Sequence, residues 1–205
     1  MGNVWFIVVL VPSIILHEVS HGWVANLCGD PTAKQAGRLT LNPIKHIDPI
    51  GSVLLPAVLV FLGVPPFGWA KPVPVNISRL RSPRRQALYV SLAGPLVNLL
   101  LSGIGLALCA YAFHVSQNAQ LFQVGIYIGV PNLTLAVFNL VPIPPLDGSA
   151  IIERIIPQHK MHSYYALRAR ALPIVMGLVI LDNFSFHLLG RLFNDVINWW
   201  IWLAT

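Results

Sequence analysis

The chain has 205 residues, of which 56% are hydrophobic and only 10% are charged, and its formal net charge is +6. This composition excludes an ordinary soluble domain and indicates a membrane protein whose main solvent is lipid. The basic residues do not indicate nucleic-acid binding, because they gather in two connections and no nucleic-acid-binding module accompanies them. Such clusters are typical of cytoplasmic loops that face anionic lipid headgroups. They are Arg79, Arg81, Arg84 and Arg85, and then Arg154, Lys160, Arg168 and Arg170.

The first apolar stretch predicts a membrane helix over residues 3–27, with a kink at Pro12 and an end at Gly29 and Asp30-Pro31. No basic residue precedes this stretch, and its second half contains two histidines and a glutamate. We therefore expect a helix that stays in the protein rather than a cleaved signal peptide.

Three less regular segments follow. Residues 31–48 contain Gly, Asn-Pro and Asp-Pro turn signals, which predict short extended pieces joined by turns. Residues 50–66 are apolar but short and contain Pro56, so they either barely span the membrane or enter it and return as a re-entrant hairpin. Residues 68–76 contain Pro72 and Pro74 and favour an extended, strand-like segment. This segment is either an edge strand for an unwound substrate or a packing element.

Two further long helices are predicted over residues 86–113 and 122–140. The second ends in a proline-rich segment, residues 141–148, that cannot continue as a regular helix. Broken backbone at membrane depth usually lines a cavity or a functional site. A basic, partly amphipathic stretch covers residues 149–170. One or two hydrophobic helices within residues 171–205 then end in Trp199, Trp200 and Trp202, which are typical of an interfacial aromatic belt.

These elements predict an all-α polytopic membrane protein with about five to six hydrophobic helices, a short membrane-associated extended or β segment, and a hairpin that is either re-entrant or spanning. We expect one integral membrane domain over residues 1–205, with its motifs within residues 10–150 and its closing helices within residues 171–205.

The clearest chemical signal is His17-Glu18-Val19-Ser20-His21 in the first helix. Two histidines four positions apart share one helix face and can bind one zinc ion, while the glutamate between them can reach a water molecule at the metal. An ionisable side chain inside a membrane helix is costly unless it is paired or functional. We therefore expect His17 and His21 to be metal ligands rather than merely hydrogen-bonded polar residues.

A catalytic zinc site needs a third protein ligand, and the acidic residues elsewhere in the chain are the candidates. Asp147 follows the longest uncharged run and lies in a rigid Pro-Pro-Leu-Asp-Gly turn at the end of a membrane helix. From these residues alone, a zinc ligand and an ordinary Asp-Gly turn are about equally favoured.

The positions of the basic loops predict the depth of the site. If these loops are cytoplasmic, helix 86–113 runs outward and helix 122–140 runs inward, so Asp147 lies near the cytoplasmic side. The histidine helix must then also run inward, which requires residues 50–66 to return as a re-entrant hairpin. A full span there would reverse the first helix.

These residues resemble the site-2 protease family of intramembrane zinc metalloproteases. The resemblance rests on the His-Glu-x-x-His helix and on Asn139-Leu140-Val141-Pro142-Ile143-Pro144-Pro145-Leu146-Asp147-Gly148, which is similar to the family's Asn-x-x-Pro-x-Pro-x-x-Asp-Gly motif. Gly94-Pro95-Leu96-Val97-Asn98 also resembles the family's Gly-Pro-x-x-Asn element, and residues 68–76 resemble a segment of its small bacterial and archaeal members. We expect a small prokaryotic-type member without a PDZ domain.

The resemblance implies that Asp147 is the third ligand of one zinc ion per chain and that Glu18 activates water. It also implies that Asn139 lies close to the metal, where its amide could bind substrate or the oxyanion. Asn98 is better explained as an interhelical hydrogen-bonding residue.

The resulting functional hypothesis is a multi-pass membrane zinc metalloprotease that cleaves membrane proteins or peptides in or near their transmembrane segments. The rival hypothesis is a non-enzymatic membrane protein, either a metal transporter or an inactive protease relative that acts as a binding partner. A transporter normally carries polar groups across several helices, and an inactive relative should lack Glu18 or a ligand. The sequence leaves the substrate and the oligomeric state open.

Overall fold

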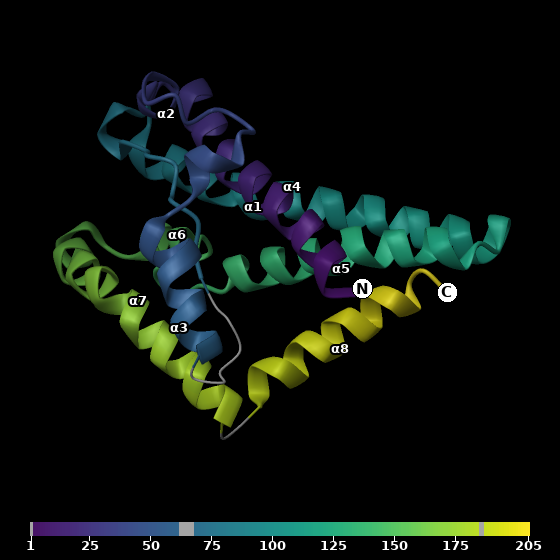
Figure 1. The fold of residues 1–205 in the computed structure, drawn as a ribbon. Helices are drawn as coiled ribbons and strands as arrows, with labels where there is room; N and C mark the ends of the chain where they lie inside the picture. The colour runs from purple at the N-terminus through teal and green to yellow at the C-terminus, as the bar shows by residue number, and fades with distance from the viewer. Residues whose placement is uncertain (1, 62–67, 185–186) are drawn as a thin grey trace. The chain divides into compact units, whose positions relative to one another are not determined.

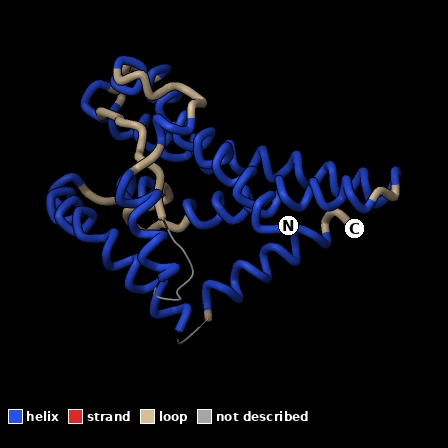
Figure 2. The backbone as a smooth tube through the Cα atoms, in the orientation of Figure 1, coloured by secondary structure: helices blue, strands red, loops and turns tan. Residues whose placement is uncertain are grey.

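The computed structural model describes residues 2–61, 68–184 and 187–205, and all regular secondary structure within these ranges is helical (Figures 1 and 2). This result confirms the predicted all-α class, whereas the extended segment at residues 68–76 is not a β-strand. The α-helices are α1 (Gly2–Leu27), α2 (Thr32–Gln35), α3 (Leu55–Phe61), α4 (Pro83–Tyr111), α5 (Ala119–Leu140), α6 (Ser149–Ile155), α7 (Met161–Phe184) and α8 (Leu188–Trp202). Short 3-10 helices at Pro43–His46, Ile77–Arg79 and Gln158–Lys160, and π-helical turns at Pro49–Leu54 and Ala112–Ser116, connect them.

Three helical stretches in the described part of the chain are long and apolar enough to cross a membrane: Val8–Leu27, Pro83–Ser116 and Ala119–Leu140. The apolar helix Pro49–Phe61 is shorter than a usual transmembrane span. The prediction of five to six hydrophobic helices is thus confirmed for three helices of membrane length, and the remainder of that count stays a prediction.

The chain divides into two compact units. The first comprises residues 10–94, and the second comprises residues 1–9 together with residues 95–205. We call them the histidine unit and the Asp147 unit, after the motif residue that each contains. The single domain predicted from the sequence stays a prediction.

Asx-Pro pairs begin the short helices of the histidine unit. Thr32 N donates to Asp30 Oδ1 at 3.0 Å, and Ile44 N donates to Asn42 Oδ1 at 3.1 Å. The proline that follows each acidic or amide residue has a backbone angle already suited to the first helical turn. The prediction of extended pieces over residues 31–48 is therefore wrong for residues 32–35 and 43–46, which form helical turns, while Asn42, Ile47 and Asp48 have extended backbone angles.

The apolar segment after Asp48 returns to its own starting point. Trp69 N donates to the Gly51 carbonyl at 3.2 Å, and the Ser52 hydroxyl donates to the Trp69 carbonyl at 2.9 Å. Gly68 lies so close to Gly51 that a β-carbon added to Gly68 would overlap the Gly51 carbonyl. The two ends of the segment are therefore adjacent, which supports the re-entrant alternative, and its tip at residues 62–67 lies outside the described residues.

In the Asp147 unit, the second half of α4 and the antiparallel α5 lie side by side (Figure 1). Small residues allow this approach, since a β-carbon on Gly105 would lie only 2.5 Å from the Gly129 backbone, well inside van der Waals contact. Trp200 of α8 packs against Gly129 and is only 3% exposed. The expected interfacial role is therefore wrong for Trp200, which belongs to the core, while Trp199 and Trp202 are exposed.

Candidate metal centre

His17 and His21 lie one helical turn apart on α1, as the spacing of the motif predicts. Their ring centroids are 4.7 Å apart and the rings meet edge to face at 84°. The His17 side chain is buried, with 7% of its surface exposed, and His21 is partly buried. Two imidazoles at this separation can bind the same metal ion.

The ring of His21 is oriented by α4. His21 Nδ1 lies 2.7 Å from the Val90 carbonyl oxygen, and because a carbonyl can only accept, Nδ1 carries the proton. The neutral ring then has its lone pair on Nε2, the atom that would bind a metal. A backbone carbonyl in this role is a usual second partner of a metal-binding histidine.

Gly94 of α4 faces both imidazoles. A β-carbon at this position would lie 2.6 Å from His17 Nε2 and closer still to His21 Nε2. Contacts this short do not occur in proteins, so the space in front of the two Nε2 atoms exists only because residue 94 is glycine. The two histidine nitrogens and this glycine-lined space fit a zinc ion, for which imidazole nitrogen is a preferred donor.

Glu18 points from the same helix to residues 68–76. Its Oε2 accepts a hydrogen bond of 2.9 Å from the backbone amide of Val73, a buried residue. This bond sets the orientation of the carboxylate between two neighbouring histidines on the helix. Glu18 is partly exposed, so its carboxylate is accessible for exchange of a proton with water.

The segment at residues 69–73 is bound to the rest of the histidine unit along one edge. Trp69 and Val73 make the backbone hydrogen bonds already described. Lys71 bonds through both of its backbone groups: its amide donates to the His46 carbonyl at 2.9 Å, and its carbonyl accepts a hydrogen bond of 2.6 Å from the Arg38 side chain. Successive residues of an extended chain direct their backbone groups to opposite edges. The odd-numbered residues thus face the protein.

The opposite edge of the same segment is open. In the described residues, the backbone groups of Ala70, Pro72 and Pro74 make no hydrogen bonds. The two prolines have no N–H group, so this edge presents three carbonyl acceptors and the single donor of Ala70. Although the segment is not part of a sheet, its open edge has the hydrogen-bonding groups of an edge strand.

Asp147 and Asn139, the other predicted site residues, belong to the Asp147 unit. The amide of Gly148 donates to the Asn139 carbonyl at 2.6 Å, which folds the turn that carries Asp147 back onto the end of α5. A β-carbon on Gly148 would overlap the Leu140 carbonyl, so the turn requires glycine. The predicted irregular backbone after α5 is confirmed, and the roles of Asp147 and Asn139 at a metal stay predictions.

The amide of Asn139 has a local partner, since its Nδ2 donates to the Leu135 carbonyl at 3.0 Å. Asn98, which the sequence interprets as an interhelical residue, donates to Asn132 Oδ1 on α5 at 2.8 Å. Both side chains of that pair are almost fully buried. The interhelical interpretation of Asn98 is confirmed, and its partner Asn132 was not foreseen.

Three residues support the histidine pair through their backbone, and the sequence predicted this role for none of them, although Gly94 is part of the Gly-Pro-x-x-Asn element. These are Gly94, which leaves space, Val90, which orients His21, and Val73, which holds Glu18. Backbone roles do not require a particular side chain, so Val90 and Val73 leave no signal in one sequence. The only available signal was Gly94 next to Pro95, an unusual pair inside a long apolar helix.

Comparison with known proteins was made on the whole chain. The model of Peptidase family M50 matches residues 5–123 and 114–181. The chain is 43% identical to "Putative zinc metalloprotease YwhC" of Bacillus subtilis over 162 residues, which are 75% of this chain and 69% of that protein. It is 32% identical to "Putative zinc metalloprotease Rip2" of Mycolicibacterium smegmatis over 187 residues, 91% of this chain and 69% of that protein. No solved structure matches the chain.

Proposed function

The chain belongs to peptidase family M50, the site-2 protease family, and we propose that it is a zinc-dependent endopeptidase that cleaves membrane proteins in or near their transmembrane segments. The observation that carries this proposal is the group formed by His17, His21 and Gly94, with Glu18 oriented beside it. Histidine pairs of this kind with an adjacent glutamate serve hydrolysis of peptide bonds by metalloproteases.

His17, His21 and Asp147 would hold one zinc ion. The two histidines offer Nε2 atoms toward one glycine-lined space. Support for Asp147 comes from the Asn-x-x-Pro-x-Pro-x-x-Asp-Gly pattern in a member of this family and from its turn at the end of α5. When bound, zinc supplies a Lewis acid that polarises the scissile carbonyl and lowers the pKa of water to about 7.

Glu18 carries the proton in this mechanism. Its carboxylate takes a proton from the attacking water and passes that proton to the nitrogen of the leaving amine. The Val73 amide bonds Oε2, so the carboxylate keeps one orientation through both transfers. No covalent bond between the protein and the substrate is needed.

Asn139 is proposed to contact the substrate or the oxyanion. Its Nδ2 donates to the Leu135 carbonyl at 3.0 Å, so this role requires the amide to change partner or to use its oxygen. A hydrogen bond donated to a developing oxyanion becomes stronger as negative charge accumulates on that oxygen.

We propose that the open edge at Ala70, Pro72 and Pro74 binds the substrate backbone. A transmembrane substrate hides its peptide groups in its own helical hydrogen bonds and must unwind before attack. An unwound segment could replace those bonds by pairing with an extended edge. The same segment bonds Glu18 through Val73 on its other edge, so a paired substrate and the proton-carrying group would be held by one segment.

The membrane is the proposed location, with the site near the cytoplasmic side. The three membrane-length helices and the hydrogen bond that joins Gly51 to Trp69 across the two ends of the apolar segment support a multi-pass arrangement in which the first helix runs inward. Exposed Arg81, Arg84 and Arg85 at the start of α4 support the same orientation, since basic loops favour the cytoplasm. α7 and α8 would supply further membrane-associated helices.

The test compares purified wild-type protein with Glu18→Gln for bound zinc and for cleavage of a panel of single-span membrane peptides. We expect about one zinc per chain in both, and at least about a 100-fold lower cleavage rate in the variant, since general base catalysis contributes about that much or more. Glu153→Gln is the matched control, because Glu153 is the only other glutamate and pairs with Arg168.

The control variant should keep both zinc and cleavage. A wild-type protein without zinc would contradict the proposal at its centre. Zinc in the wild type with equal cleavage by Glu18→Gln would remove Glu18 from the mechanism. Zinc with no cleavage of any peptide would favour a non-enzymatic role.

A further inference from the structure

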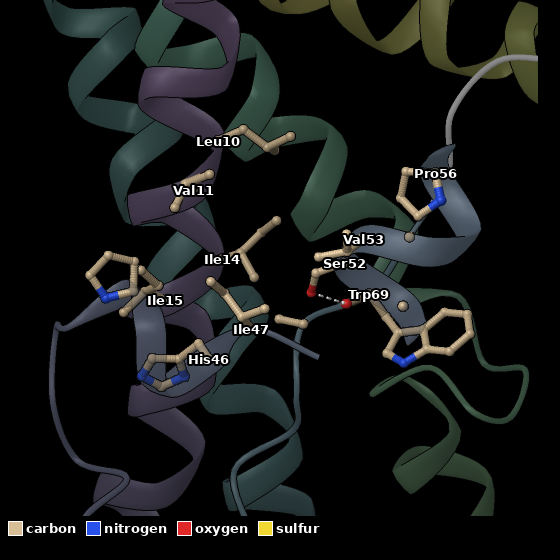
Figure 3. A pocket seen from close by; sticks show the side chains of 14 residues that line it. Leu10, Val11, Ile14, Ile15, His46, Ile47, Ser52, Val53, Pro56 and Trp69 are labelled. Carbon is tan, nitrogen blue, oxygen red and sulfur yellow. Dashed lines mark hydrogen bonds between the residues drawn. The ribbon is translucent and has the colours of Figure 1, made fainter. Parts of the chain in front are cut away.

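A cavity of about 420 Å³ lies within the histidine unit, between the first half of α1 and the hairpin (Figure 3). Leu10, Val11 and Ile14 of α1 form one wall, and Val53 and Trp69 lie on the other (Figure 3). The volume falls within the range of about 300–1,000 Å³ that is usual for ligand pockets. It is large enough for any single natural side chain.

The lining of the cavity is almost entirely apolar. Two of its polar side chains bond backbone carbonyls: the Ser52 hydroxyl bonds the Trp69 carbonyl, as the dashed line in Figure 3 shows, and His46 Nε2 bonds the Thr40 carbonyl at 2.9 Å. The other ring nitrogen of His46, Nδ1, is buried without a hydrogen-bond partner among the described residues. An occupant would therefore be held mainly through burial of apolar surface and shape. An aliphatic or aromatic side chain has this chemistry.

The cavity adjoins the open backbone edge. Ala70, whose N–H and carbonyl lie on that edge, also lines the cavity. Three residues further along, Val73 bonds Glu18. An extended chain rises about 3.3 Å per residue, so Ala70 and Val73 lie roughly 10 Å apart along the segment.

The helix α1 also brings the cavity close to Glu18. Ile14 lines the cavity and precedes Glu18 by four residues, which places both on one face of α1 about 6 Å apart along the helix axis. The cavity and the proton-carrying group are thus neighbouring features of one surface. A substrate paired to the open edge would lie beside the cavity, on the segment whose other edge holds Glu18.

We propose that this cavity is a specificity pocket for one large apolar side chain of the substrate, two or three residues from the scissile bond. The proposal rests on the proposed protease function and adds a selection rule to it. A substrate strand at the open edge would insert a Leu, Phe or Trp side chain between Ile14 and Val53, while a small residue at that position would leave the cavity unfilled.

The experiment uses a set of single-span peptides that differ only in the residue at each position near the cut, with Ala, Leu, Phe or Trp. For the wild type, we expect a large residue at one position to raise kcat/KM by about 10-fold or more over Ala, as filling an apolar pocket does. Val53→Trp, which fills the cavity, should abolish that preference, so that the Leu, Phe and Trp peptides are cleaved no faster than the Ala peptide.

Val60→Trp is the matched control, because Val60 is exposed on α3 and does not line the cavity. It should keep the wild-type preference. Val11→Trp fills the cavity from the opposite wall and gives a second variant if Val53→Trp does not fold. An unchanged preference in both filled variants, or an equal effect on every peptide, as expected for a bound lipid chain, would overturn the proposal.

A binding measurement separates this proposal from the protease function. Fluorescently labelled Phe and Ala peptides are titrated into Glu18→Gln and into Glu18→Gln with Val53→Trp. Tighter binding of the Phe peptide by about 10-fold, lost on filling, supports the pocket even if the wild type cleaves nothing. Equal affinity for both peptides would refute the pocket even if the wild type is an active protease.

Discussion

Gly94 lies where α4 passes the two histidines of α1, and any side chain there would occupy the space in front of their Nε2 atoms. On the other side of His21, the Val90 carbonyl holds Nδ1 and selects the tautomer that leaves Nε2 as the metal-binding atom. One turn of α4 therefore supplies both the space and the orientation. Neither contribution comes from a side chain.

Gly94→Ala should lower zinc affinity by about 10- to 100-fold, the range found when groups that orient metal ligands are changed. The added β-carbon would overlap both imidazoles and force them apart. A competition titration against a chelator measures the change. Gly103→Ala on the same helix is the control, since a β-carbon there meets nothing within 4 Å; equal affinities of the two variants would contradict the assignment.

At the scale of elements, the extended segment is fixed at its far end by Asp30. This carboxylate is fully buried and accepts hydrogen bonds from Asn76 N at 2.6 Å and from the amide and hydroxyl of Thr32. Burial by itself would raise the pKa of Asp30, but these hydrogen bonds and nearby Arg79 hold that pKa below its ordinary value of 3.8. Asp30 thus connects the end of α1 to the segment that carries Val73.

Asp30→Asn should lower the free energy of unfolding by about 1–3 kcal/mol at pH 7. The side-chain amide is uncharged, and its NH2 group would face backbone and hydroxyl donors that now bond the carboxylate. A carboxyl with a lowered folded-state pKa contributes stability above its unfolded pKa and loses it as the pH falls through the folded value. The difference from wild type should therefore shrink below about pH 4. Thermal unfolding in detergent between pH 3 and pH 7 measures it.

The exposed carboxylate Asp195 provides the comparison. Asp195→Asn should leave the unfolding temperature near that of the wild type across the same pH range. A gap between Asp30→Asn and the wild type that stays constant down to pH 3 would show that the charge of Asp30 is not the stabilising feature.

At the scale of the whole molecule, the membrane topology depends on whether Pro49–Phe61 belongs to a hairpin or to a span. The bonds of Trp69 with Gly51 and Ser52 bring the two ends of this segment together. A re-entrant hairpin leaves both ends on one side of the membrane, and the connection between α4 and α5 then lies on the other side.

Cysteine labelling tests this arrangement. In a background without Cys28 and Cys109, Asp48→Cys and Lys71→Cys should react with a membrane-impermeant maleimide from the same, cytoplasmic side. Ser116→Cys, in the exposed turn before α5, should react from the outside. Labelling of residues 48 and 71 from opposite sides would mean a full span and would reverse the direction of α1.

The sequence by itself determined the features that depend on neighbouring residues. His17 and His21 share a face because a helix repeats every 3.6 residues, and the apolar runs specify helices because lipid leaves no other partner for the backbone. The break after Leu140 follows in the same way from prolines that cannot donate. These conclusions needed no knowledge of distant contacts.

Only the tertiary structure decided which distant backbone groups meet. Val90 and His21 are 69 residues apart, and Glu18 and Val73 are 55 residues apart, so no local pattern reveals that they bond. The burial of Trp200 against Gly129 and the closure of the hairpin at Gly51 and Trp69 are likewise long-range contacts. Local spacing therefore specifies the chemical groups of the candidate site, whereas packing between segments specifies how those groups are oriented and what space surrounds them.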